Sequence, residues 1–325
     1  NYVWTGFTSN VYTLPANWSP VRTLPNMNDK LVFNSTSPIT ITGVATETVR
    51  VMEVTNGTIV NLAGTGNTLS VSDTLSLGNN ARVRNGANFT LASGKDTVAT
   101  GVLLVGTGSG VNGNFARWFN STTGQVSFPL IDTAGTTREV TVQYTVGATQ
   151  YGSLTASFVN AIPGNAGLPV NDPVASVTAT RAGVNGYWSL LPNGINGGEF
   201  TGTFNATGFT GVNSYTGLFL MRRSGNATNW AINGTHVTTA GSNAAPVLSR
   251  TNMTQYGQYG VGGDTLVNTL PVTLVMFKAS NAAGDVNLNW ATSTEINNKG
   301  FFIERSLDGE KFEEIGFVTG KGNSK

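Results

Sequence analysis

The sequence predicts an all-β protein. Thr occurs 46 times and Ser 23 times among the 325 residues, and Val, Ile, Phe and Tyr are also frequent. Thr and the other β-branched or aromatic residues favour strands, whereas Gly and Asn favour the turns between them. Short alternating runs separated by such turns recur along the chain, and no capped 3.6-residue pattern indicates a helix.

The composition argues against several classes of function. A net charge of +1 without a basic run does not suit a nucleic-acid partner, whose phosphates require clustered Lys and Arg. Because the chain has no Cys and a single His, His236, we expect no disulfide framework, no metal site and no cofactor. No apolar stretch approaches the roughly 18 residues of a membrane-spanning helix, so we expect no transmembrane segment.

The first residues indicate a processed start. Asn1–Trp4 contains neither an initiator Met nor a charged-then-apolar leader. We interpret this as a mature N-terminus from which an export signal has been removed, although an artificially chosen start would look the same. The expected location is therefore extracellular or at the cell surface.

Residues 1–110 are predicted to form a short β-solenoid with an aromatic cap. Short apolar strands recur there at nearly regular intervals, separated by Gly, Asn or Thr turns. Such strands bury little alone, but stacked coils share a core. An antiparallel sandwich has similar spacing and is the alternative. The expected strands are Ile39–Ile41, Val49–Val51, Thr58–Val60, Leu69–Val71, Leu75–Leu77, Phe89–Leu91 and Leu103–Val105.

Residues 111–268 are predicted to form an antiparallel β-sandwich, because the strands of this region are longer. Examples are Glu139–Tyr144, Phe200–Phe204 and Leu218–Leu220. We expect Trp188 and Trp230 to anchor its core.

Charge density separates the end of the chain from these two regions. Residues 1–270 contain 12 basic and 10 acidic residues, whereas residues 271–325 contain 6 and 7, about three times the density. Pro271 lies at this change, after the Gly-rich stretch Gly257–Gly263, so we expect a linker there. Residues 269–325 are predicted to form a third, incomplete module.

The N-terminus carries a series of aromatic and turn motifs: Trp4-Thr5-Gly6, Asn17-Trp18-Ser19, and Pro25 and Asp29 before Leu31-Val32-Phe33. This series resembles the opening turn of many bacterial secreted β-solenoid proteins. The resemblance implies a cap, in which aromatic side chains cover the first coil so that its edge does not pair with other chains.

The C-terminal region combines alternating strands with a good hairpin turn. Val286, Leu288 and Trp290 fall on one strand face, Phe301, Ile303 and Arg305 alternate on the next, and Asp308-Gly309 suits the turn. Leu270–Leu274 precedes these strands, and Phe312 and Ile315-Gly316 follow them. Together these residues closely resemble the fibronectin-III-like module near the C-terminus of Bacteroidota surface proteins exported by the type IX secretion system.

This resemblance implies a type IX secretion cargo whose partner is the secretion machinery. In such proteins a sorting domain usually follows the module and is removed on export. A fibronectin-III sandwich needs about seven strands and ~90–100 residues, but only about four strands fit in residues 271–325. We favour a longer protein as the explanation; strands donated by a partner chain are the alternative.

Four Asp-Thr-apolar triplets resemble the O-glycosylation signal of Bacteroidota secreted proteins. Four of the eight Asp residues begin such a triplet, where composition alone predicts about one. The resemblance implies that Thr74, Thr97, Thr133 and Thr265 carry sugars. The alternative is that Asp-Thr pairs are simply suited to turn-to-strand junctions.

Candidate catalytic residues are sparse. His236 has no acid or nucleophile near it in the sequence, so we expect a surface or turn position. Glu139, Glu199 and Asp172 are scattered, whereas glycoside hydrolysis needs two carboxylates about 5–10 Å apart. Arg222-Arg223 is expected at the surface.

Tyr256 and Tyr259 are the candidate sugar-stacking residues, because a flat ring complements a pyranose face and each ring adjoins a Gly. The alternative is a strand that packs these rings against the sandwich.

These features predict a non-enzymatic, structural or adhesin-like cell-surface glycoprotein exported by the type IX system. The first alternative is a carbohydrate-binding or hydrolase-accessory protein. The second is a filament subunit whose C-terminal module is completed by a neighbouring copy. The expected partners beyond the secretion machinery are glycans or other copies of the chain.

Overall fold

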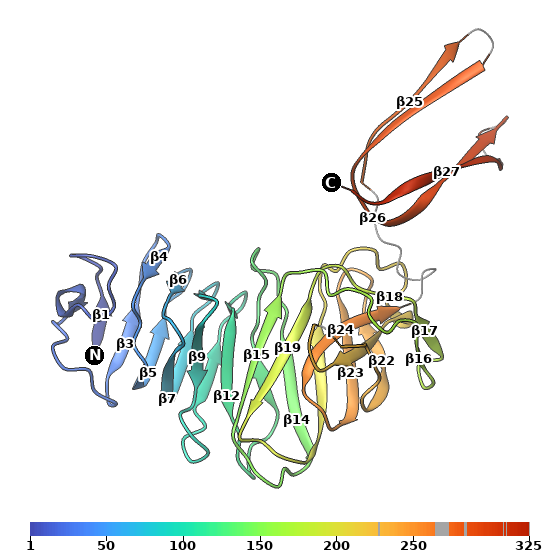
Figure 1. Cartoon of the computed structure of the whole chain (residues 1–325). Helices are drawn as coiled ribbons and strands as arrows, with labels where there is room; N and C mark the ends of the chain where they lie inside the picture. Colours follow the sequence, from blue (N-terminus) through green and yellow to red (C-terminus); the bar gives the residue numbers. More distant parts are fainter. Residues whose placement is uncertain (227, 264–272, 283–284, 308, 310, 325) are drawn as a thin grey trace. The chain divides into compact units, whose positions relative to one another are not determined.

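The computed structural model describes residues 1–226, 228–263, 273–282, 285–307, 309 and 311–324. Contacts divide the chain into an N-terminal unit, Asn1–Val267, and a C-terminal unit, Asn268–Lys325. Strands dominate both units (Figure 1), which confirms the predicted all-β class. The helices described are two short 3-10 turns, η1 (Pro15–Asn17) and η2 (Tyr215–Gly217).

The N-terminal unit begins with a β-solenoid of about four turns, as predicted. Its strands stack in parallel and form three ladders. Ladder 1 contains β3, the C-terminal halves of β5 and β7, and β10; ladder 2 contains β4, β6, β8 and β11; ladder 3 contains the N-terminal halves of β5 and β7, then β9 and β12. The strands are β3 (Lys30–Phe33), β4 (Ile39–Ile41), β5 (Glu47–Val54), β6 (Ile59–Leu62), β7 (Asn67–Leu77), β8 (Arg82–Asn85), β9 (Phe89–Ser93), β10 (Val102–Val105), β11 (Gly110–Asn112) and β12 (Asn114–Trp118).

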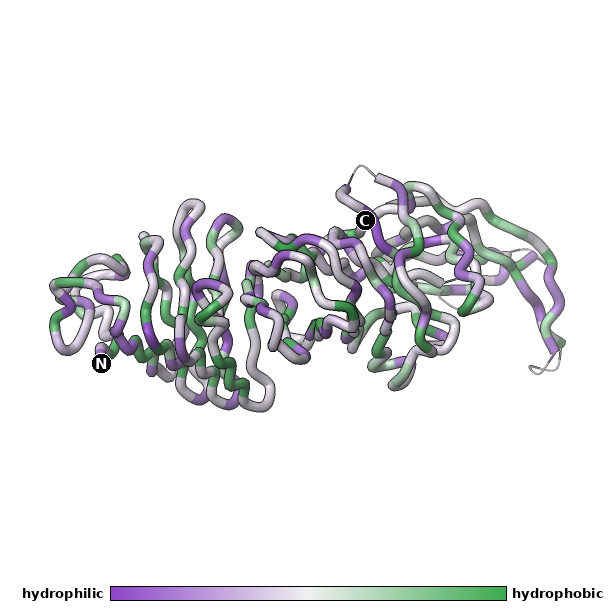
Figure 2. Tube along the Cα trace, turned by 90° about the horizontal axis from the view of Figure 1, so that it is seen from below, coloured by the Kyte–Doolittle hydropathy of each residue, from purple (hydrophilic) through white to green (hydrophobic). Residues whose placement is uncertain are grey.

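Side chains alternate between the inside and the outside of each coil, because successive residues of a strand point to opposite faces. In ladder 1, Leu31, Met52 and Leu75 occupy equivalent inward positions and are fully buried. The outward positions of the first three strands are mostly polar, with Val32 and Val51 as the apolar exceptions, and Lys30 and Glu53 form an ion pair there at 2.6 Å. Figure 2 shows the coils as separate loops with apolar and polar residues alternating along them.

Asparagine side chains join the turns of successive coils. The Asn56 Oδ1 accepts a hydrogen bond from the Asn79 N–H at 2.8 Å, and the Asn79 Oδ1 accepts one from the Thr107 N–H at 2.9 Å. A glycine is needed at Gly106, beside these asparagine hydrogen bonds, since a Cβ there would lie 2.5 Å from the Asn79 backbone nitrogen. The turn chemistry therefore fixes the stacking register as well as the direction of the chain.

Aromatic side chains close the N-terminal end of the solenoid. The first strand, β1 (Tyr2–Trp4), pairs in parallel with β3 and antiparallel with β2 (Trp18–Ser19). The Trp18 ring meets Trp4, Tyr12 and Phe33 edge-on, with centroids 5.0, 5.4 and 5.8 Å away. This cluster covers the first coil.

An antiparallel sandwich follows the solenoid. One sheet continues from the solenoid through β15 (Ser153–Val159), β19 (Tyr187–Asn193), β24 (Gly257–Gly263), β18 (Arg181–Ala182) and β21 (Phe219–Arg223). The second sheet has the order β13 (Val126–Phe128), β14 (Val140–Val146), β20 (Glu199–Asn205), β23 (Pro246–Met253) and β22 (Thr235–Gly241). A separate hairpin consists of β16 (Val170–Asp172) and β17 (Val177–Ala179).

Trp188 and Trp230 are both buried, as predicted for core anchors. Trp188 of β19 meets Phe204 of the second sheet with ring centroids 5.3 Å apart. Trp230 lies against β24, where a Cβ on Gly260 would be 2.7 Å from the indole ring. The Gly-rich stretch is thus a core strand of the sandwich, and its glycines make room for bulky neighbours.

The solenoid and the sandwich share one sheet. Strand β12 pairs in parallel with β9 of the last coil and antiparallel with β15 of the sandwich. Buried apolar residues form a continuous core from Trp4 to Val261. Residues 1–110 and 111–263 therefore meet through continuous hydrogen bonding.

The C-terminal unit is a three-stranded antiparallel sheet of β25 (Thr273–Ala282), β26 (Asp285–Ser306) and β27 (Phe312–Ser324). The sequence suggested about four strands; three are described, because the two expected strands around Trp290 and Phe302 belong to the single long β26. Pro271 and Asp308 lie outside the described residues. The Trp290 and Phe301 rings pack edge-to-face at 5.6 Å.

Candidate functional site

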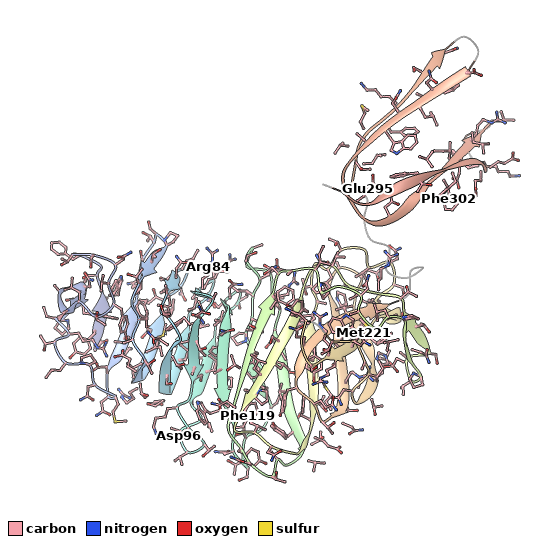
Figure 3. The ribbon with its side chains drawn as sticks, viewed as in Figure 1. Arg84, Asp96, Phe119, Met221, Glu295 and Phe302 are labelled. Carbon is pink, nitrogen blue, oxygen red and sulfur yellow. The ribbon has the colours of Figure 1, made fainter. Side chains whose placement is uncertain are left out.

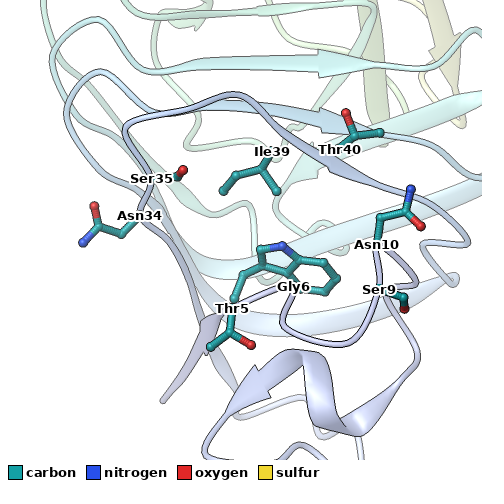
Figure 4. A pocket seen from close by; sticks show the side chains of 9 residues that line it. Thr5, Gly6, Ser9, Asn10, Asn34, Ser35, Ile39 and Thr40 are labelled. Atoms are coloured by element: carbon teal, nitrogen blue, oxygen red, sulfur yellow. The ribbon is translucent and has the colours of Figure 1, made fainter.

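A pocket of about 300 Å³ lies in the N-terminal cap (Figure 4). Amide and hydroxyl side chains dominate its wall, with one indole and one aliphatic side chain among them. The lining residues are Trp4, Thr5, Gly6, Ser9, Asn10, Asn34, Ser35, Ile39 and Thr40.

Asn17 fixes the loop that forms one side of this cap pocket. Its Oδ1 accepts hydrogen bonds from the N–H groups of Thr8 at 3.1 Å and Ser9 at 3.0 Å. Its Nδ2 donates to the Ser9 Oγ at 3.1 Å and to the Val11 carbonyl at 2.7 Å. Because Asn17 is fully buried and uses both ends of its amide, the loop is held in one shape.

A second cavity, of about 420 Å³, lies at the far end of the solenoid. Its wall includes Val105 and the turn after β10, residues of the 127–137 segment, and Glu139. The Glu139 carboxylate accepts a hydrogen bond from the Ser127 hydroxyl. Glu139 is the ionisable residue among those that line this cavity.

The three carboxylates considered for hydrolysis do not come together. Glu139 precedes β14 and Glu199 begins β20, and the antiparallel register of these strands places the two residues at opposite ends of the pair. Asp172 ends β16 and is fully buried against Arg250. The geometry does not assemble an acid pair from these residues.

Arginines hold several acidic side chains inside the N-terminal unit. Arg22 bonds Asp29 at 2.8 Å and Glu47 at 3.1 Å in the aromatic cap. Arg138 bonds Asp132 at 2.8 Å. In each pair both side chains are largely buried, so these charges neutralise each other inside the protein and are not presented to a ligand.

The Asp172–Arg250 pair is the most deeply buried of these ion pairs. Arg250 also donates to the carbonyls of Asn233 at 3.0 Å, Leu220 at 3.2 Å and Gly234 at 2.7 Å. Burial acts to raise the pKa of Asp172. Hydrogen bonds from the Ala175 N–H and from Arg250, together with the charge of Arg250, outweigh burial and lower that pKa.

His236 was expected at a surface or turn position. It lies on strand β22 opposite Arg250 and is partly buried, and burial lowers its pKa.

The expectation that Arg222-Arg223 lies at the surface is wrong for Arg223, which is 2% exposed. Its guanidinium lies 4.3 Å from the Trp230 ring centroid and donates to the Pro163 carbonyl at 2.6 Å. The aromatic face and the carbonyl replace the water that a charged group loses on burial.

The candidate O-glycosylation residues lie in different settings. Thr74 is on β7, partly exposed, and its hydroxyl contacts the Asp73 carboxylate at 3.1 Å. Thr97 is partly exposed in the loop next to Asp96, which Figure 3 shows projecting from the solenoid. Thr133 is exposed in a turn, and Thr265 lies outside the described residues.

Tyr256 and Tyr259 pack against the sandwich. Tyr259 is fully buried, so it presents no ring face to a sugar in this structure. Tyr256 is partly exposed, but one ring face stacks on Phe200 at 5.0 Å and its hydroxyl contacts that of Tyr144. These contacts correspond to the alternative in which the rings belong to a packed strand.

Among the described residues there is no group of three or more His, Cys, Asp or Glu side chains placed to hold a metal ion. None of the helices in that same part of the chain has the length and apolar character needed to cross a membrane. No protein-family model, curated protein or solved structure matches the chain.

Proposed function

We propose that this protein is a non-enzymatic, structural or adhesin-like protein of the cell surface, exported by the type IX secretion system. The observation that carries the proposal is a capped solenoid that continues into a sandwich through one sheet. Solenoids offer extended surfaces for binding. The buried acids of this unit are engaged by arginine in structural pairs, which supports a role for its surface.

Fractionation of the native organism tests the proposed location. We expect an antibody against residues 1–263 to detect the protein at the cell surface or in the medium, and to detect less of it after the export machinery is disabled. A protein confined to the cytosol would contradict the proposal.

Intact mass measurement of the native protein tests the sugars on Thr74, Thr97, Thr133 and Thr265, because each glycan adds mass to the polypeptide.

Carbohydrate binding is the second candidate function, and the cap pocket favours it. An indole lies there beside amide and hydroxyl groups, and sugar recognition uses this combination of an apolar ring and hydrogen-bonding groups. The pocket also has a fixed loop, so binding would not have to order it first. Under this proposal the ligand is a neutral saccharide.

Glycan-array binding tests this candidate. Asn10→Ala removes a polar group from the pocket wall without touching the aromatic cluster, so we expect it to weaken binding and leave folding intact. Tyr256→Phe is the matched control away from the pocket, and a loss of binding in this variant would instead locate the sugar at the sandwich.

We further propose that the C-terminal unit is part of a fibronectin-III-like module whose sheet packs against additional strands. The supporting observation is its exposed aromatic side chains, including Phe277, Phe302 and Phe317, at 58, 64 and 48% exposure; Phe302 is labelled in Figure 3. Size-exclusion chromatography over a range of concentrations tests whether a second copy supplies these strands. A monomer at every concentration would exclude the filament alternative.

A further inference from the structure

The three solenoid ladders end differently. Ladder 3 continues from β12 to β15, and ladder 2 continues from Val111 to residues 129–131 through hydrogen bonds of 2.8 and 3.0 Å. In ladder 1, the last strand is β10, and within the described residues its pairing partner is β7. One side of the solenoid therefore ends in an open strand edge.

The side chains of β10 are those of a covered strand. Val105 is equivalent to Phe33, Val54 and Leu77, which are at most 1% exposed, yet Val105 is 43% exposed. On the outer face, each earlier strand of ladder 1 carries at least one polar residue, and the Lys30–Glu53 pair lies beside Val51 and Val32. Strand β10 instead has Val102 and Leu104, which are 52 and 53% exposed. A strand that is apolar on both faces is typical of one that is covered on both sides.

The backbone of β10 is also ready to pair. The Gly106 N–H donates to the Leu77 carbonyl at 2.7 Å, toward β7. Because the backbone groups of a strand point alternately to its two sides, the N–H and carbonyl groups of Leu103 and Val105 point toward the open edge. These groups can bind a further strand, the fifth of ladder 1, in the parallel register of the earlier coils.

The cavity of about 420 Å³ begins at this edge. Val105 and the turn after it form one part of the wall, and Glu139 lies in the same wall. A strand added in parallel to β10 would pass Val105 and run on into this cavity with its C-terminal residues. The charge of Glu139 favours a Lys or Arg at that point. Two cations lie near this wall: Arg82 donates to the Ala134 carbonyl at 3.4 Å, and Arg117 donates to the Ser127 carbonyl at 3.0 Å.

We propose that β10 is a docking edge for an extended peptide segment of another polypeptide, which adds a parallel strand to ladder 1. The segment has four consecutive apolar residues, whose side chains pack beside those of β10 on both faces of the sheet, followed within a few residues by a Lys or Arg that pairs with Glu139. Strand addition of this kind takes its affinity from the main chain and its specificity from side-chain pockets. Strand docking at β10 does not depend on the proposed export route.

Fluorescence anisotropy with two synthetic peptides of sequence SGVIVIGGKGS and SGVIVIGGEGS tests this proposal on the full chain. We expect the Lys peptide to bind at least about tenfold more tightly than the Glu peptide at low salt, because only the Lys peptide complements Glu139. Glu139→Gln is expected to reduce this preference to within about threefold. Equal binding of both peptides to the unaltered protein would overturn the charge assignment.

Two substitutions at one position test the strand geometry. Val105→Pro removes an N–H that points to the open edge and leaves the hydrogen bonds to β7 in place, whereas Val105→Thr keeps the N–H and the branched shape. We expect the Thr variant to bind the Lys peptide and the Pro variant to lose binding, with melting temperatures within about 3 °C of each other. Undiminished binding by a folded Pro variant would overturn the proposal, as would failure of the unaltered protein to bind either peptide. A second copy of this chain is the other occupant that could use the edge, and sedimentation velocity tests for it. A dimer that Val105→Pro dissociates would show that a second copy, and not another polypeptide, pairs with β10.

Discussion

The buried Asp172–Arg250 pair gives the sharpest stability prediction. Asp172→Asn keeps the shape of the side chain but leaves the Arg250 guanidinium, which is 1% exposed, without its counter-ion. Removing one partner of a buried ion pair costs about 3–5 kcal/mol. For a unit of this size each kcal/mol lowers the melting temperature by roughly 2–4 °C, so we expect a decrease of about 10 °C.

The assay is urea and thermal unfolding at neutral pH, with Asp73→Asn as the matched control. Asp73 pairs with Arg50 at 3.2 Å, but both side chains are 50% exposed, so this change is expected to cost less than about 1 kcal/mol. The double variant Asp172→Asn/Arg250→Met should be more stable than Asp172→Asn alone, because it removes the orphaned charge. A loss no larger than that of Asp73→Asn would refute the role assigned to the pair.

The pH dependence of stability gives the same pair a second readout. The pKa of Asp172 is lowered in the folded protein, whereas it is about 3.9 in the unfolded chain. The pair therefore stabilises the fold fully above the unfolded pKa, and this contribution is lost as the pH falls through the folded pKa. In Asp172→Asn, the free energy of unfolding should fall less steeply as the pH is lowered. If it falls as steeply as in the unaltered protein, other carboxylates cause the acid dependence.

Three further changes test other parts of the N-terminal unit. Leu75→Ala leaves a cavity in the solenoid core and should cost about 2–5 kcal/mol in urea unfolding; a cost below 1 kcal/mol would mean that the coils repack. Asn79→Ala removes the acceptor for the Thr107 N–H and should cost about 1 kcal/mol by the same assay, whereas Asn88→Ala at an exposed turn position provides a comparison. The lowered pKa of His236 means that its stabilising contribution is complete above about pH 6.5 and is lost as the pH falls toward the folded pKa; His236→Gln should remove that part of the pH dependence, measured as melting temperature between pH 5 and 8.

The local pattern was enough to predict the solenoid but not all of its strands. The expected runs at Leu69–Val71 and Leu75–Leu77 are both present, although they belong to one strand, β7. Strand β8 (Arg82–Asn85) was not expected, because its single apolar residue, Val83, lies between two arginines. That strand forms because its neighbours in the stack supply hydrogen bonds on both sides, and the sequence of one segment contains no sign of this.

The surroundings of the candidate residues could not be predicted either, because they depend on contacts between residues far apart in the sequence. Arg222-Arg223 was expected at the surface, yet the fold buries Arg223, and it also buries Arg250. Asp172 is 78 residues from Arg250 in the sequence, so only the tertiary structure brings the pair together. Glu139 was notable in the sequence only as a carboxylate. Its position at an open strand edge depends on where each ladder ends, and no local motif records that.

The ends of the solenoid explain how its parts depend on one another. A coil buries its apolar interior only if something covers it, and the first coil is covered by the Trp18 cluster. At the other end, Leu69, Leu91 and Phe115 lie in register and are fully buried, so β12, which carries Phe115, completes the stack of ladder 3 and joins it to β15 of the sandwich. The sandwich therefore caps two of the three ladders, and within the part of the chain that the structure describes, ladder 1 is the one with an uncovered end. Strand β10 is apolar, and its backbone groups at the open edge can form hydrogen bonds, whereas the ends of the other ladders are covered. This pattern is expected where a strand from a partner completes the sheet.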